Sequence, residues 1–205
     1  MINEVKRAIV DNKLVIVAAT IIFFSSLILG YVLEPNLYSY FNPVVDDFTQ
    51  KVESGVIQLT FEDIFFNNIK IISQMFIYGI IFCFSVLILA FNGFFVGYYV
   101  ATCDNLIYTL LLIIPHGIFE FSSCILASAA GFILFNFIYR FLKTFWEYDD
   151  DSASESLKFS FRENFYKLKQ ALIIFLIAAI LMVIAGIVEV YLTIPIANYI
   201  VSLLG

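Results

Sequence analysis

The residues of this chain that are best suited to chemistry are one histidine and two glutamates set in apolar sequence. His116 is the only histidine, and Glu120 follows it four residues later. If the segment after Pro115 is helical, the two side chains lie about one turn apart on the same helix face. Glu189 lies in a second apolar stretch. Ionisable groups at membrane depth are costly and usually serve a function, so His116, Glu120 and Glu189 are the primary candidates for a functional site.

Three kinds of chemistry fit this set of residues. Carboxylates that change charge can pass a proton or cation through a membrane. One histidine and two glutamates could also hold zinc with a water molecule in an open position. As an acid and a base, the same groups could serve hydrolysis within the bilayer.

A structural role is the fourth interpretation, in which the polar side chains bond to backbone groups freed at broken helix ends. We favour it, because the sequence has neither an HExxH motif nor a serine or cysteine nucleophile pattern. We therefore predict no enzymatic activity, no catalytic residue, no bound metal and no cofactor. His116, Glu120 and Glu189 stay the only metal candidates.

The elements that position these residues belong to a membrane protein. The chain is 62% hydrophobic and 14% charged, with a mean hydropathy of +0.96. A soluble domain is closer to half apolar and a quarter charged. No basic cluster is interleaved with aromatic residues, so nucleic acid is not an expected partner. The lipid bilayer is an expected partner.

Apolar runs predict the spans, because a helix needs about 20 residues to cross the hydrocarbon core of a bilayer. Pro115 and Gly117 predict a break between two of them, since proline ends or kinks a helix. The chain is then a single domain, residues 1–205, with an all-α fold: a polytopic transmembrane helical bundle of about five spans. The predicted spans are 14–33, 71–91, 93–114, 117–139 and 170–194.

The distribution of charge predicts the orientation. Lysines and arginines cluster in the first 13 residues and in the linker 140–169, whereas the loop 34–70 is mostly acidic. Short basic segments stay on the cytoplasmic side. Five spans then place the N-terminus in the cytoplasm and the acidic loop outside, in a multi-pass protein of the cytoplasmic membrane. If 93–114 were instead a re-entrant pair, the basic linker would lie outside, so we disfavour that alternative.

Two helices are expected outside the spans. Thr60 to Asp63 has the pattern of a helix start with acids in the first turn, which predicts a helix in the outer loop. In the basic linker, four apolar residues fall on one helical face. They predict an amphipathic helix on the inner membrane surface. These residues are Leu157, Phe161, Phe165 and Leu168.

Polar and small residues interrupt the apolar runs. Small residues at a spacing of four allow close helix approach, as in Gly93 with Gly97 and in Ser123, Ala127 and Gly131. We favour packing within the chain for these positions, and a homodimer seam is the alternative. The predicted helix-break and supporting polar positions are Pro115, Gly117, Asn67, Asn68, Asn92 and Asp104.

Several motifs occur in an order that resembles one family. They are Phe66-Asn67-Asn68, Gly79, Asn92-Gly93 with Gly97, Pro115-His116-Gly117-Ile118-Phe119-Glu120, a small-residue run to Gly131, and Glu189 to Pro195. Together they are similar to the stage II sporulation protein M family of bacterial and archaeal membrane proteins. One departure is Thr193-Ile194-Pro195, where the family tends to place threonine directly before proline.

The resemblance implies a polytopic protein of about five spans and a non-enzymatic role. The namesake is a membrane part of the engulfment machinery that works with cell-wall hydrolases without being one. We therefore expect a scaffold or complex subunit that recruits or positions other membrane or envelope proteins. A channel or transporter component using His116, Glu120 and Glu189 is the runner-up, and an intramembrane metal-dependent hydrolase comes third.

Overall fold

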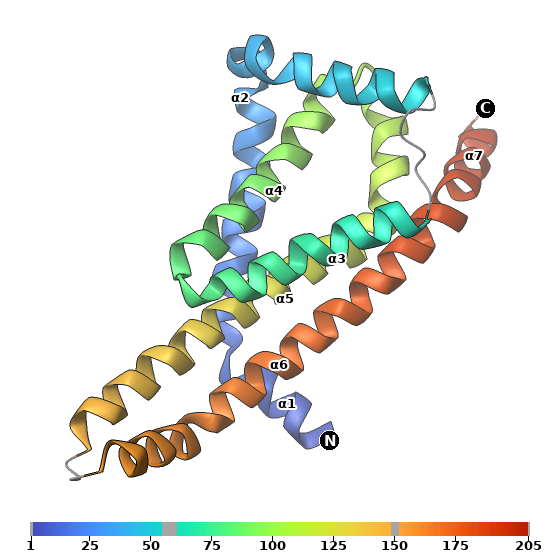
Figure 1. The fold of residues 1–205 in the computed structure, drawn as a ribbon. Coiled ribbons are helices and arrows are strands. Elements are labelled where there is room, and N and C mark those ends of the chain that lie inside the picture. The colour runs from blue at the N-terminus through green and yellow to red at the C-terminus, as the bar shows by residue number, and fades with distance from the viewer. Residues whose placement is uncertain (1, 55–60, 149–151, 205) are drawn as a thin grey trace.

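The chain is helical in almost all of the residues that its computed structural model describes, which are 2–54, 61–148 and 152–204. Within these ranges the secondary structure consists of helices, without a strand. Figure 1 shows their arrangement. The helices are α1 (Ile2–Asp11), α2 (Lys13–Glu53), α3 (Phe61–Ile77), the short 3₁₀ helix η1 (Tyr78–Ile80), α4 (Phe82–Thr102), α5 (Leu106–Glu147), α6 (Ala153–Tyr191) and α7 (Thr193–Leu204).

Four helices of the described chain are long and apolar enough to cross a membrane: α2, α4, α5 and α6. Their outward faces carry large apolar side chains such as Ile21 and Leu176, which are 62% and 61% exposed. Apolar groups on the outside are expected where lipid, not water, surrounds the helices. The prediction of an all-α polytopic membrane protein is confirmed.

Two predicted spans have other bounds in the structure. The helix expected over 71–91 is interrupted at Tyr78–Ile80, where α3 ends and the chain turns into α4. The helix expected over 93–114 is interrupted between Thr102 and Leu106. There Asn105 caps α5, because its side-chain oxygen accepts a hydrogen bond of 3.0 Å from the backbone N–H of Tyr108.

The predicted break at Pro115 and Gly117 is wrong. Both residues lie inside α5, which continues from Leu106 to Glu147. A proline removes one backbone hydrogen bond but is tolerated within a membrane helix, where it bends the axis. Figure 1 shows α5 changing direction after its first turns. Two prolines, Pro35 and Pro43, lie inside α2 in the same way, and α2 bends so that its acidic second half runs across one end of the molecule.

The last predicted span and the predicted amphipathic helix are parts of one helix, α6. Residues 152–185 contain neither proline nor glycine, so nothing in the sequence stops the helix before the apolar run begins. The helix ends at Tyr191, three residues before the predicted end at 194. Pro195 explains this end, because its ring opposes the carbonyl of Tyr191, four residues earlier.

The helices are arranged as two closely packed pairs, α5 with α6 and α2 with α4, and α3 lies across α5 and α6. Glycines allow the close approach of α2 and α4 in the second pair. An added Cβ at Gly97 would clash with the carbonyl oxygen of Leu27, and one at Gly30 with that of Phe94. Helices this close need residues without side chains at the crossing. The predicted small-residue pair Gly93 and Gly97 therefore serves packing within the chain.

The second predicted small-residue set lies where α5 meets its neighbours. Ser123 is fully buried and donates a hydrogen bond of 2.7 Å to the carbonyl oxygen of Ala178 on α6. Gly131 lies against Gly79 of η1, and an added Cβ at Gly131 would lie 2.6 Å from the carbonyl oxygen of Met75. One apolar core joins these helices, with Phe23 of α2, Met75 of α3 and Leu89 of α4 fully buried in it.

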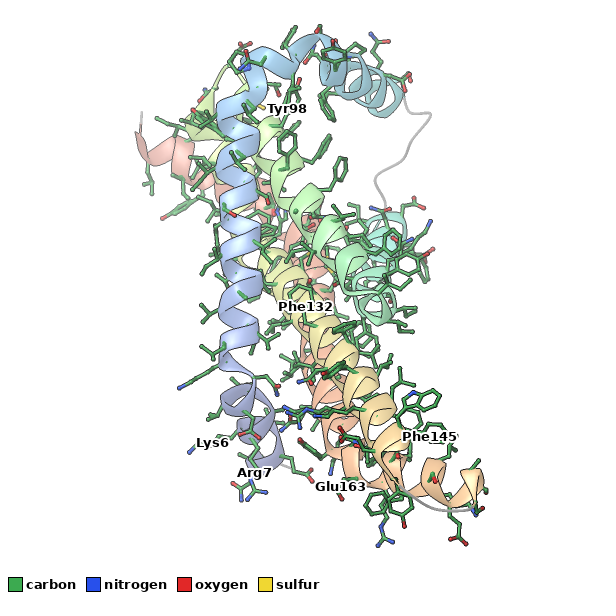
Figure 2. The ribbon with its side chains drawn as sticks, turned by 90° about the vertical axis from the view of Figure 1, so that its left-hand side faces the viewer. Lys6, Arg7, Tyr98, Phe132, Phe145 and Glu163 are labelled. Atoms are coloured by element: carbon green, nitrogen blue, oxygen red, sulfur yellow. The ribbon has the colours of Figure 1, made fainter. Side chains whose placement is uncertain are left out.

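The two basic segments lie at the same end of the molecule. Figure 2 shows Lys6 and Arg7 of α1 at the same end as Glu163 of α6, whereas Tyr98 lies towards the other end. A polar network joins α1 to α6 there. The buried Lys167 Nζ donates to Asn12 Oδ1 and to Gln170 Oε1, both at 3.1 Å. Glu4 and Lys169 form an ion pair nearby.

Candidate functional site

The structure brings His116, Glu120 and Glu189 together. His116 and Glu120 lie one turn apart on α5, and Glu189 lies in the last turn of α6. One ligand atom of each residue lies within 4.8 Å of the other two. These three residues, with the Thr193 side chain described below, form what we call the His116 cluster.

The imidazole and its nearer carboxylate face each other without bonding directly. His116 Nε2 lies 3.9 Å from Glu120 Oε2, which is too long for a hydrogen bond. The two side chains are 15% and 23% exposed. They are thus half-buried.

Thr193, the first residue of α7, completes the cluster. Its Oγ1 lies 3.3 Å from His116 Nδ1. The same hydroxyl donates a hydrogen bond of 3.1 Å to the carbonyl oxygen of Val188. Sequence reasoning missed Thr193 as a site residue, although it lies two residues before Pro195, whose effect on α6 places the threonine at a helix start. A polar side chain shortly before a proline in an apolar run could have marked Thr193 as a candidate site residue.

Helix irregularities position the cluster. Pro115 lies inside α5 directly before His116, whose side chain faces Thr193 and Glu189 near the end of α6. Gly117 is buried in the same helix. The break at Leu192, between α6 and α7, brings Thr193 back against α5. Pro115 and Gly117 thus lie beside His116 inside α5, and neither residue ends a helix.

The other predicted polar positions lie on elements that contribute nothing to the cluster. Asn67 and Asn68 are on α3, exposed and half-buried respectively. Asn92 is half-buried on α4, beside Gly93 of the α2–α4 seam. Asp104 was expected in the middle of a span, but it is exposed in the turn between α4 and α5. An exposed turn residue carries no burial cost, so the reason for considering Asp104 no longer holds.

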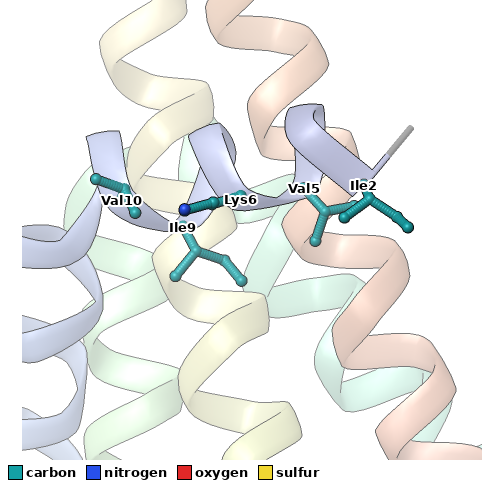
Figure 3. A pocket seen from close by; sticks show the side chains of 5 residues that line it. All are labelled: Ile2, Val5, Lys6, Ile9 and Val10. Atoms are coloured by element: carbon teal, nitrogen blue, oxygen red, sulfur yellow. The ribbon is translucent and has the colours of Figure 1, made fainter.

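Surface hollows lie far from the cluster. One is formed by the apolar face of α1, which is lined by Ile2, Val5, Lys6, Ile9 and Val10 (Figure 3). A second is lined by the adjoining polar residues of α1. Both are shallow features of a ten-residue amphipathic helix, so the chemistry of the described chain is concentrated in the His116 cluster and not in these hollows.

Comparison with known proteins identifies the family. The family model described as stage II sporulation protein M matches residues 17–194, a range that includes every residue of the His116 cluster. The chain belongs to the stage II sporulation protein M family. Two relatives in Methanocaldococcus jannaschii, the uncharacterized proteins MJ0706 and MJ0793, are each 31% identical to it. The first match covers 98% of this chain and 91% of the relative, and the second covers 93% and 99%.

No solved structure matches the chain. Membership of the stage II sporulation protein M family therefore rests on sequence, over most of the chain's length. It confirms the resemblance drawn from the ordered motifs.

Proposed function

We propose that this protein is a non-enzymatic integral membrane scaffold or complex subunit that positions other membrane or envelope proteins in the cytoplasmic membrane. One observation carries the proposal: the α5–α6 hairpin is much longer than a bilayer is thick. At 1.5 Å per residue, the 39 residues of α6 span about 58 Å, against about 30 Å of hydrocarbon. Roughly half of the hairpin therefore projects from the membrane.

The projecting part of the hairpin has the surface of a binding element. We call it the hairpin tip, residues 139–148 and 152–166. Trp146 is 81% exposed there, and other large apolar side chains are exposed around it. Contiguous exposed apolar surface outside a membrane marks an interaction site. The exposed apolar residues are Tyr139, Leu142, Trp146, Leu157, Phe159, Phe161, Phe165 and Tyr166.

The inner face of the hairpin tip is closed by small and polar residues. Ser156, Ser160 and Asn164 recur every four residues on α6 and are buried against α5. Asn164 Nδ2 donates to Thr144 Oγ1 across the pair at 3.1 Å. Because small residues and the Asn164–Thr144 hydrogen bond close this seam, the aromatic residues of the predicted amphipathic face are left outside for a partner or the membrane surface. Exposed Lys158 and Arg162 favour the cytoplasmic side for the tip.

A photo-crosslinking experiment in native membranes tests the scaffold. A benzoylphenylalanine at Trp146 should form a discrete protein adduct, since the tip faces a partner. The matched control is the same group at Leu176, which is 61% exposed in the apolar half of α6 and should react with lipid. If the group at position 146 gives lipid adducts or none, the scaffold proposal is wrong.

A flux measurement separates the scaffold from the transport alternative. The scaffold predicts no proton or cation flux in liposomes for either the native chain or Glu120→Gln. Flux in the native protein that Glu120→Gln abolishes would favour a channel or transporter component instead.

A further inference from the structure

The His116 cluster holds two acidic side chains, and in the part of the chain that the structure describes neither forms an ion pair with a lysine or arginine. Residues 71–139 and 170–205 contain no lysine or arginine. In a poorly hydrated environment, neighbouring carboxylates need a positive charge or a proton between them.

The hydrogen bonds of Thr193 assign the state of the imidazole. The Thr193 hydroxyl has one proton, and it donates this proton to the Val188 carbonyl oxygen. Thr193 Oγ1 can therefore only accept from His116 Nδ1, at 3.3 Å. Nδ1 then carries a proton, and in the neutral ring Nε2 carries the lone pair. That lone pair faces Glu120 Oε2 at 3.9 Å.

A lone pair that faces carboxylate oxygens is repelled unless a cation or a proton lies between them. An imidazole whose far nitrogen is held by a hydrogen bond is also the usual arrangement of a metal-binding histidine. We propose that His116 Nε2, Glu120 and Glu189 bind one Zn²⁺, with Thr193 as a positioning residue. The geometry of the cluster carries this assignment, which goes beyond the scaffold role.

The donor set favours zinc over the commoner hard cations. Mg²⁺ and Ca²⁺ take oxygen ligands almost throughout, whereas Zn²⁺ accepts imidazole nitrogen together with carboxylate oxygen. Ligand atoms around a tetrahedral zinc ion lie about 3.4 Å apart at bond lengths near 2.1 Å. The ligand atoms of the cluster lie at most 4.8 Å apart. Side-chain rotations that move these atoms by about an ångström would bring them to zinc-binding distances.

Such an ion would cross-link two helices. His116 and Glu120 belong to α5, whereas Glu189 belongs to α6 and Thr193 to α7. Bound zinc would fix the bend of α5 against the break between α6 and α7. The role assigned to it is structural, and the proposal includes no reaction.

Zinc binding is tested on the full chain in lipid nanodiscs, purified without a polyhistidine tag. Because the chain has a single histidine, every imidazole signal comes from His116. We expect one Zn²⁺ per chain by metal analysis, and a titration with Zn²⁺ that shifts the ¹⁵N resonance of Nε2 while Nδ1 stays protonated. Mg²⁺ should leave the spectrum unchanged. An imidazole protonated on both nitrogens at neutral pH, unmoved by zinc, would instead show a His116–Glu120 ion pair and overturn the proposal.

Variants give a second test. Glu189→Gln keeps the side-chain shape and should weaken zinc binding by more than about 100-fold, beyond the effect typical of a supporting residue. The matched control is Glu147→Gln on α5, an exposed glutamate paired with Lys143, which should bind zinc like the native chain. Equal affinity of Glu189→Gln and the native chain would overturn the assignment of Glu189.

Thr193→Val tests the positioning residue. We expect zinc binding to weaken about 10- to 100-fold. The ¹⁵N spectrum of the zinc-free variant should also show a mixture of imidazole tautomers, which a merely structural threonine would not produce. A variant with native affinity and a single tautomer would remove Thr193 from the site.

Discussion

Glu4 and Lys169 show how one exposed pair can fix a terminal element. The hydrogen bond from Lys169 holds the pKa of the Glu4 carboxyl below its usual range, and the positive charge of Lys169 adds to the effect. Both side chains are about half exposed, so the pair is screened by salt and weak. It joins α1 to α6 at the basic end of the molecule, next to the buried Lys167 network.

The pair makes the docking of α1 depend on pH. A carboxyl whose pKa is lowered by folding stabilises the folded state above its unfolded pKa of about 4.3, and this contribution is lost as the pH falls through the lower folded value. We expect the distance between spin labels at Asn3 and Glu163 to broaden below about pH 4. Glu4→Gln should give the broader distribution at every pH. A native distribution that stays narrow at pH 3 would contradict this role.

Sequence reasoning at the residue scale found the cluster but not all of its members. Their place in apolar sequence marked His116, Glu120 and Glu189 as candidates, and the structure brings their ligand atoms within 4.8 Å of one another. Thr193 escaped because a threonine in an apolar run is common and costs little to bury when bonded to its own helix. Its importance depends on a helix break, which hydropathy does not report.

The α2–α4 seam decides stability at the scale of the elements. The crossing depends on glycines because each helix lies against backbone carbonyl oxygens of the other. Gly97→Ala would place a methyl group against the carbonyl of Leu27, which cannot move without separating the helices. Overpacking of this kind costs about 1–3 kcal/mol.

We expect Gly97→Ala to lower the free energy of unfolding by that amount in detergent denaturation. Gly117→Ala is the control, because its added methyl would lie 3.0 Å from the ring of Phe121, the movable end of a side chain. Similar losses in the two variants would show that the seam tolerates a wider separation.

Helix class was predictable from the sequence, whereas helix bounds were not. Hydropathy reports that a run is apolar, but apolar residues continue through the break at Tyr78–Ile80. Pro115 looked like a break, yet packing of α5 against its neighbours maintains the helix through it. Asn105 was the informative residue, since its cap marks the start of α5. The start of α5 was thus readable from a local cap, whereas hydropathy gave no bounds for the other helices.

One end of the molecule holds most of its lysines and arginines, and we call it the basic end; the other end is acidic. α1 and the hairpin tip lie at one end, and the acidic second half of α2 lies at the other. We expect the basic end to be cytoplasmic, because short basic segments are retained there. The acidic half of α2 then faces outward.

Cysteine labelling from each side of sealed vesicles checks this orientation. With the three native cysteines replaced by alanine, a cysteine at Lys6 or Lys158 should react with a membrane-impermeant maleimide only from the cytoplasmic side. A cysteine at Asp46 or Glu62 should react only from the outside. If cysteines at positions 6 and 158 reacted from opposite sides of the membrane, both the orientation and the observed packing of α1 on α6 would be contradicted.

The unbroken course of α6 has a mechanical consequence. From Ala153 in the hairpin tip to Glu189 in the cluster, one helix runs without a proline for about 54 Å at 1.5 Å per residue. A helix that long behaves as a stiff rod, so a twist applied to the tip turns the far end as well. A protein that turned the α6 part of the tip against α5 would therefore also move Glu189 relative to His116. The tip and the His116 cluster are thus mechanically coupled through α6.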